Sequence, residues 1–173
     1  MNTKNLKKII IAAMFSAVIA VATMIIRIPS PTGYVNFGDP FVLIAGWLLG
    51  PFGILAAAIG SALADFLSSY TIYIIPTFII KGCMALCAWW VFKAISKGGK
   101  KLIFGSYITS AVIAEIIMIS GYFAFEAIFF NPMLAVQSVL GNVFQGLTGI
   151  VAGTLLIGAI KKLNLHIIYL KSP

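Results

Sequence analysis

Three ionisable side chains lie within otherwise apolar stretches of this sequence: Asp65, Lys81 and Glu115. If such stretches cross a membrane, burying each charge costs at least about 2.5–3.5 kcal/mol, so these residues are candidates for function. Asp65 and Lys81 flank one predicted loop, 68–76, and would therefore sit at a similar depth. They could form a structural ion pair between two helices or line a binding cavity, and the sequence leaves both interpretations open.

Two further segments each gather polar side chains on one helical face. Glu115, Tyr122 and Glu126 are spaced seven and four residues apart, which places them on the same side of a helix with 3.6 residues per turn. A second such face carries Ser138, Asn142 and Gln145. The amides could either bond neighbouring helices together or contribute hydrogen bonds to a ligand.

Aromatic side chains accompany these polar groups near the predicted external segments: Tyr34, Phe37, Tyr70, Tyr73 and Tyr122. Aromatic surface with a few fixed polar groups is typical of a small-molecule site, although tyrosines also form the interfacial belt of membrane proteins. Together they predict a modest cavity that opens to the outside. We predict that its substrate contacts Asn36, Asp65, Tyr70, Lys81, Glu115, Tyr122, Asn142 and Gln145.

Enzyme motifs are poorly represented. The single histidine, His166, lies in the C-terminal tail, and the sequence contains no H-E-x-x-H or Walker motif. Cys83 and Cys87 would lie one turn apart on one helix, which favours a packing role over a disulfide or a metal site. We therefore expect no catalytic residue, no metal and no cofactor. A membrane-embedded lipid- or isoprenoid-processing enzyme remains the alternative, and it would turn its ligand over, whereas a binding protein retains it unmodified.

The composition shows which elements must position these residues. Of the 173 residues, 61% are hydrophobic and 9% are charged, and the mean hydropathy is +1.09. Soluble domains carry about 25% charged residues, so a water-soluble protein is excluded. The ranges 9–26, 40–64 and 127–160 contain no charged residue. About 20 apolar residues form one transmembrane helix, and the period-two alternation of a membrane β-barrel is missing.

The positive charges fall into three groups that the positive-inside rule places in the cytoplasm, which explains the net charge of +8 without nucleic acid. These groups comprise Lys4, Lys7 and Lys8, then Lys93, Lys97, Lys100 and Lys101, and finally Lys161, Lys162 and Lys171. Gly50-Pro51 divides the long apolar run 40–67 into two helices, because proline cannot continue a helix. We predict an all-α bundle, one transmembrane domain over 1–173 with both termini cytoplasmic. Its six helices would cover about 9–27, 40–49, 52–67, 77–95, 102–126 and 133–161, with external loops at 28–40 and 68–76.

Small residues on the first predicted helix form a separate candidate surface. Ala13 and Ala17 lie four residues apart, and small residues at this spacing let helix backbones approach closely in lipid. They could pack within the bundle or dock a partner helix. Because this helix begins near the predicted cytoplasmic surface, we predict that Ala13 and Ala17 contact a partner.

An ordered set of motifs resembles the substrate-binding S components of energy-coupling factor (ECF) transporters. The resemblance covers most of 9–160, and Ser69 departs from it, because glycine is expected before Tyr70. The segments that carry it are YVNFGD at 34–39, Gly50-Pro51, GSALAD at 60–65, TFIIKG at 77–82, GYF at 121–123 and GNVFQ at 141–145.

This resemblance implies a six-helix fold that holds substrate at its outer side. It also implies a membrane coupling subunit and two cytoplasmic ATPase subunits as partners, with an Ala-x-x-x-Ala patch, here Ala13 and Ala17, contacting the coupling subunit. The chain would be the substrate-capture subunit of an ATP-driven vitamin importer in a bacterial plasma membrane. The branch it resembles is linked to riboflavin, pyridoxine, pyridoxamine and hydroxymethylpyrimidine. We expect a pyridine or pyrimidine vitamin or precursor first, and riboflavin second.

Overall fold

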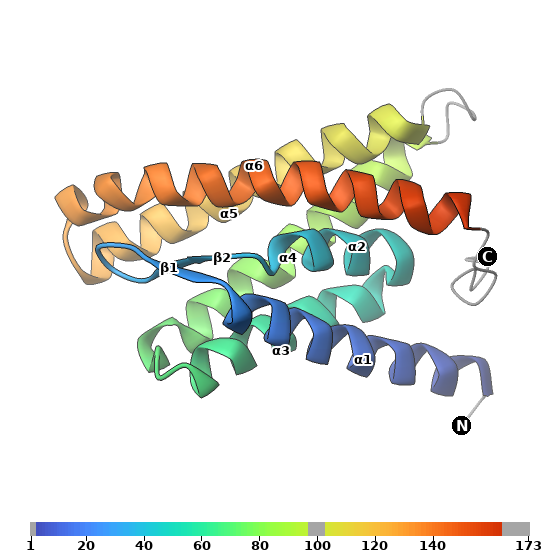
Figure 1. Cartoon of the computed structure of the whole chain (residues 1–173), viewed down its shortest axis with the longest axis horizontal. Helices are drawn as coiled ribbons and strands as arrows, with labels where there is room; N and C mark the ends of the chain where they lie inside the picture. The colour runs from blue at the N-terminus through green and yellow to red at the C-terminus, as the bar shows by residue number, and fades with distance from the viewer. Residues whose placement is uncertain (1–2, 97–102, 164–173) are drawn as a thin grey trace.

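The computed structural model describes residues 3–96 and 103–163, and the chain there is mostly helical. The longer helices pack around a short buried helix, α2, and a small hairpin follows the first helix (Figure 1). In chain order the elements are α1 (Thr3–Ile25), β1 (Arg27–Pro29), β2 (Tyr34–Asn36), α2 (Asp39–Leu49), α3 (Pro51–Leu67), the 3-10 turn η1 (Thr71–Tyr73), α4 (Ile74–Ile95), α5 (Ile103–Phe129) and α6 (Pro132–Lys162).

Among the described helices, α1, α4, α5 and α6 contain stretches long and apolar enough to cross a membrane. Helices α2 and α3 are shorter, with 11 and 17 residues, because Gly50-Pro51 separates them. Gly50 has a φ of 56°, a left-handed conformation that glycine adopts without strain, and Pro51 begins α3. The break predicted from the sequence therefore occurs at this dipeptide.

The segment predicted as an external loop over 28–40 instead contains a two-stranded antiparallel hairpin. Its register pairs Arg27 with Asn36 and Pro29 with Tyr34. The turn is closed by the Ser30 N–H, which donates to the Gly33 carbonyl at 3.0 Å, and by the Gly33 N–H, which donates to Ser30 Oγ at 3.1 Å. Such short strands were not predicted because prolines and glycines dominate the segment.

Helix boundaries also differ from those expected. Helix α1 begins at Thr3 rather than at 9, since its lysine-bearing first turns are helical too, and it ends at Ile25, where the hairpin begins. Helix α5 extends to Phe129 beyond the expected 126. The expected start of this helix at 102 lies outside the described residues, as do Lys97, Lys100, Lys101, Lys171 and His166.

Helix α2 occupies the interior and packs on α3, α4 and α6. Nearly all of its side chains are buried, and apolar side chains from four helices meet there: Leu43, Met84, Met118 and Ile157. Large apolar side chains such as Ile25, Trp90 and Leu140 remain exposed on the outside of the bundle. This arrangement suits a protein whose outer surface faces lipid tails rather than water.

The two ends of the bundle differ in chemistry (Figure 1). One end, here called the hairpin end, holds β1 and β2, the connection from α3 to α4, and the turn from α5 to α6. The opposite end, the lysine end, holds the start of α1 and the ends of α4 and α6. Lysines of these segments include Lys7, Lys8, Lys93, Lys161 and Lys162.

Candidate functional site

A small cavity, with about 30 Å³ of enclosed space, lies at the hairpin end. Six elements that are distant in the sequence surround it, from β2 to α6. Its lining consists mainly of tyrosines and hydrogen-bonding side chains: Gly33, Tyr34, Asn36, Asp65, Tyr73, Thr77, Tyr122, Glu126, Asn142 and Gln145. A concave site with aromatic walls and convergent polar groups can bind a small organic molecule.

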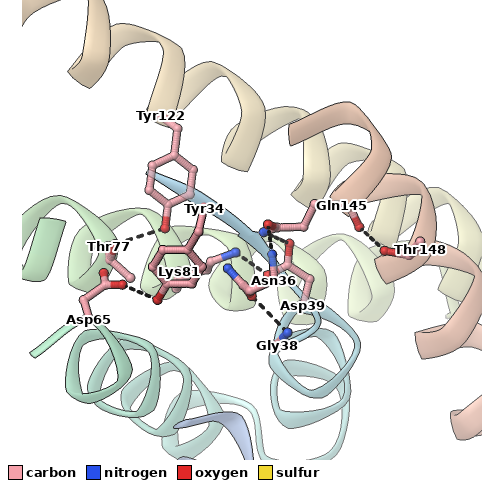
Figure 2. A network of polar contacts seen from close by, with 10 residues as sticks. All are labelled: Tyr34, Asn36, Gly38, Asp39, Asp65, Thr77, Lys81, Tyr122, Gln145 and Thr148. Carbon is pink, nitrogen blue, oxygen red and sulfur yellow. Dashed lines mark hydrogen bonds and ion pairs between the residues drawn. The ribbon is translucent and has the colours of Figure 1, made fainter. Parts of the chain in front are cut away.

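Gln145 ties the hairpin and α2 to α6. Its Oε1 accepts a hydrogen bond from the Asn36 backbone N–H at 2.8 Å, and its Nε2 donates to Asp39 Oδ2 at 2.8 Å. Figure 2 shows Gln145 reaching from α6 toward both residues. Asn36 in turn accepts from the Gly38 N–H at 3.0 Å, which shapes the entry into α2. One amide side chain thus holds three elements together beside the cavity.

Lys81 forms a buried ion pair with Asp39, whose side chain is wholly inaccessible. Of the two interpretations of Lys81, the ion pair between helices is present, but its partner is Asp39 rather than Asp65. The Lys81 ammonium also lies 5.6 Å from the centre of the Tyr122 ring. A buried charge of this kind needs a partner, because leaving either charge unpaired costs about 3–5 kcal/mol.

Two carboxylates at the cavity are each held by one tyrosine hydroxyl. The Tyr34 hydroxyl donates to Asp65 Oδ1 at 2.6 Å, and the Tyr73 hydroxyl donates to Glu126 Oε1 at 3.1 Å. Burial raises the pKa of Tyr34, and the neighbouring Asp65 carboxylate raises it further. The Tyr34 phenol therefore stays protonated and remains a donor at neutral pH.

Further aromatic contacts build the wall of the cavity. The Thr77 hydroxyl, which lies beside Asp65, shares a hydrogen bond with the Tyr122 hydroxyl at 3.0 Å. The ring centres of Tyr34 and Tyr70 are 4.6 Å apart, and those of Tyr73 and Tyr122 are 6.3 Å apart. Figure 2 shows Tyr122 and Tyr34 descending toward Thr77 and Asp65 from different elements.

The predicted site residues do not all lie at the cavity. Those that line it are Asn36, Asp65, Tyr122, Asn142 and Gln145. Tyr70 packs behind Tyr34 instead, and Lys81 is engaged with Asp39 behind the lining.

Glu115 is not among the lining residues. It lies beside Asp39 and against Gly149, where an added Cβ would collide with Glu115 Oε1. Glu115 and Glu126 do lie on the same face of α5. Eleven residues of helix nevertheless separate them by about 16 Å along the helix axis. Sequence periodicity indicates the face of a helix and leaves the depth of the cavity undefined.

Sequence reasoning did not include several residues of the cavity and its surroundings among the predicted site residues. Tyr34, Tyr73 and Glu126 had been noted only as an aromatic wall or a helical face, and Asp39 and Thr77 only within motifs. The sequence did offer one indication that Asp39 is buried. An apolar run follows it directly, so a buried helix would begin at a charged residue. In the part of the chain that the structure describes, no cluster of histidine, cysteine and carboxylate side chains could hold a metal ion.

Ala13 and Ala17 are both exposed on α1. Contact with α3 is made by a different face, where the Ser16 backbone lies so close to Gly60 that an added Cβ would collide with the Ser16 carbonyl oxygen. Ala20 and Ile19 are buried on that side. The pair formed by Ala13 and Ala17 is therefore available at the surface of the described bundle.

Comparisons with known proteins place this geometry in a family. Over 93% of its length the chain superposes on a solved structure described as the S component of a bacterial ECF transporter, covering 99% of that chain with a TM-score of 0.75 and 22% identity. An uncharacterized protein in a gap 3′ region from Pyrococcus woesei is 33% identical over 138 residues, which span 78% of this chain and 88% of that protein. The family model described as ECF-type riboflavin transporter, S component, matches residues 3–162. The chain therefore belongs to the S-component family of ECF transporters, a family of transporter subunits rather than of enzymes.

Proposed function

We propose that this chain captures a small aromatic heterocyclic vitamin, or a precursor of one, in the cavity at its hairpin end. The observation that carries the proposal is the convergence of tyrosines and buried polar groups from six elements on one cavity. The lining residues would contact the substrate. Tyr70, Lys81 and Glu115 would support that lining from behind.

The proposal includes an orientation in the membrane. The chain would form one transmembrane domain over 1–173 that crosses the plasma membrane six times with both termini in the cytoplasm. The collection of lysines at the end opposite the cavity supports it, because lysine-rich ends of membrane proteins stay on the cytoplasmic side. The cavity would then open to the outside, where substrate is captured.

The cavity is small, with about 30 Å³ of enclosed space. Among the candidate vitamins we therefore place the single-ring compounds pyridoxine, pyridoxamine or hydroxymethylpyrimidine first as substrates. Riboflavin is the second candidate, and the description of the matching family model favours it.

Import would require partners, which we propose are a membrane coupling subunit and two cytoplasmic ATPase subunits. The exposed pair Ala13 and Ala17 supports a contact between α1 and the coupling subunit, because small side chains permit close helix approach. ATP hydrolysis by those subunits would drive release of the substrate inside. The family assignment argues against the lipid- or isoprenoid-processing enzyme.

Native mass spectrometry of the purified chain tests this function. We expect an unmodified aromatic heterocycle to co-purify with the wild type and with Gln137→Leu, but not with Asn142→Leu. Both substitutions replace an amide on α6, but only Asn142 lines the cavity. Retention by Asn142→Leu would place the ligand elsewhere, and chemical conversion of a retained ligand would indicate an enzyme.

A further inference from the structure

Asp65 and Glu126 line the cavity, and each has one buried carboxylate oxygen without a hydrogen-bond partner among the described residues. Their side chains come from α3 and α5, and these residues are only 4% and 3% exposed. One oxygen of each accepts a tyrosine hydroxyl. Asp65 Oδ2 and Glu126 Oε2 accept no hydrogen bond that meets the geometric criteria within the described residues, and the Thr77 hydroxyl lies beside Asp65. Buried acceptors are rarely left unpaired in folded proteins, so a ligand that donates hydrogen bonds would complete both groups.

No cation of the cavity lining balances these two carboxylates. Of the described residues that line the cavity, the charged ones are Asp65 and Glu126, and both are acidic. Lys81 is near enough to interact electrostatically with Asp65, but it is not a lining residue and is already paired with Asp39. Arg27, which stands 5.8 Å from the Tyr34 ring centre, is exposed on β1 and lies outside the lining. The cavity therefore favours a ligand that brings positive charge.

The rest of the lining suits the same kind of ligand. Tyr34, Tyr73 and Tyr122 line the cavity, and aromatic faces attract cations. Asn142 is 91% buried, and its Nδ2 donates to no other group in the described part of the chain. The site thus offers two acceptors and one donor, which matches a ring that carries an amine on one side and an acceptor atom on another.

We propose that Asp65 and Glu126 make this site selective for a protonated amine, so that the preferred ligand is an amine-bearing heterocycle rather than its alcohol counterpart. The inference rests on the proposed function and adds the charge of the substrate to it. It assigns to the two carboxylates a role in specificity: each receives a hydrogen bond from the ligand through the oxygen that its tyrosine leaves free.

Pyridoxamine and pyridoxine form a matched pair of probes, because they differ in one aminomethyl against one hydroxymethyl group. We expect calorimetry on the purified chain in detergent at neutral pH to show at least about tenfold tighter binding of pyridoxamine, since hydrogen bonds to charged groups are the stronger kind. Equal binding, or tighter binding of pyridoxine, overturns the amine selectivity and leaves substrate capture intact. Binding of riboflavin alone does the same. Absence of binding for all three overturns the proposed ligand class as well.

Glu126→Gln and Asp65→Asn remove the charge and keep the shape of each side chain. Either variant should reduce the preference for pyridoxamine about tenfold or more while pyridoxine binding changes little. Gln137→Glu, which adds a carboxylate to α6 outside this cavity, should leave the preference unchanged. A preference that survives in both folded charge-removal variants, or that rises equally in Gln137→Glu, overturns the assignment. Thermal unfolding identifies a variant that fails to fold, in which case the other variant decides.

Discussion

Lys81 and Asp39 show how a few buried charges can organise an otherwise apolar protein. The Asp39 carboxylate accepts from Lys81 through Oδ1 and from Gln145 through Oδ2, so one side chain at the start of α2 joins α4 and α6. All four acidic residues of the chain are buried. Because each buried charge is costly in this setting, the positions of these four residues constrain how the helices can pack.

Lys81→Ala should destabilise the protein by about 3–5 kcal/mol, because it leaves the Asp39 carboxylate buried and uncompensated. The measurement is thermal or denaturant unfolding of the purified chain in detergent. The double variant Asp39→Asn with Lys81→Met should recover much of this loss, since it removes both charges together. Equal stability of Lys81→Ala and the wild type would contradict a functional ion pair between these residues.

Asn142→Ala should weaken substrate binding about five- to a hundredfold while the fold is retained, because its buried Nδ2 has no partner in the described protein and is free for a ligand. Titration of the co-purifying ligand, or of pyridoxamine, measures the effect. Gln137→Ala on the same helix is the matched control and should bind like the wild type. Unchanged affinity in a folded Asn142→Ala protein would show that this amide does not contact the ligand.

Helix α1 has one face packed on α3 and another that is exposed. One face meets α3 at the close contact between Ser16 and Gly60, and the other leaves Ala13 and Ala17 exposed. In lipid an exposed apolar helix gains little from hydrophobicity alone, so close backbone approach across small residues is what a partner helix can use. The two faces make different predictions for substitutions with large side chains.

Ala13→Trp or Ala17→Trp should abolish uptake in cells and weaken assembly with the coupling subunit, because a bulky side chain holds the partner helix away. Ligand affinity of the isolated chain should stay within a few-fold of the wild type. Gly60→Leu provides the contrast: its side chain meets the Ser16 carbonyl, so folding and binding should fail together. Loss of ligand affinity in folded Ala13→Trp would assign this patch to the bundle interior.

The whole molecule is polarised between its two ends. The cavity lies at the hairpin end, whereas Lys7, Lys8, Lys93, Lys161 and Lys162 lie on segments at the lysine end. In the proposed topology, the preference of lysine for the cytoplasmic side would orient the cavity outward. The proposed ligand site and the proposed surface for ATP-driven partners would then lie on opposite sides of one membrane.

Single cysteines test this orientation in a chain whose Cys83 and Cys87 have been replaced by alanine. Ser96→Cys, which ends α4 at the lysine end, should react with a membrane-impermeant reagent only after the cells are opened. Ser69→Cys, in the connection from α3 to α4, should react in intact cells because Ser69 is exposed at the hairpin end. The reverse pattern would invert the topology, and reaction of both from the same side would exclude an odd number of crossings between them.

Much of the helical arrangement could be predicted without the structure because its causes are local. Gly50-Pro51 interrupts a helix through its own backbone geometry, and apolar length marks the long helices. Helical periodicity placed Tyr122 on a polar face, and it lines the cavity. Ser69, where the family resemblance expects glycine, has a φ of 65°, a left-handed conformation that explains that expectation.

Contacts between distant segments could not be predicted in the same way. Lys81 and Asp39 are 42 residues apart, and Gln145 and Asp39 are 106 apart, so their pairing depends on how α2, α4 and α6 are rotated and shifted against one another. Local periodicity defines which side chains share a face, but it sets neither the rotation of a helix in the bundle nor the depth of the cavity. For that reason Glu115, which was expected to contact substrate, lies outside the cavity lining, while Asp39, a residue in a loop motif, is the partner of the buried lysine.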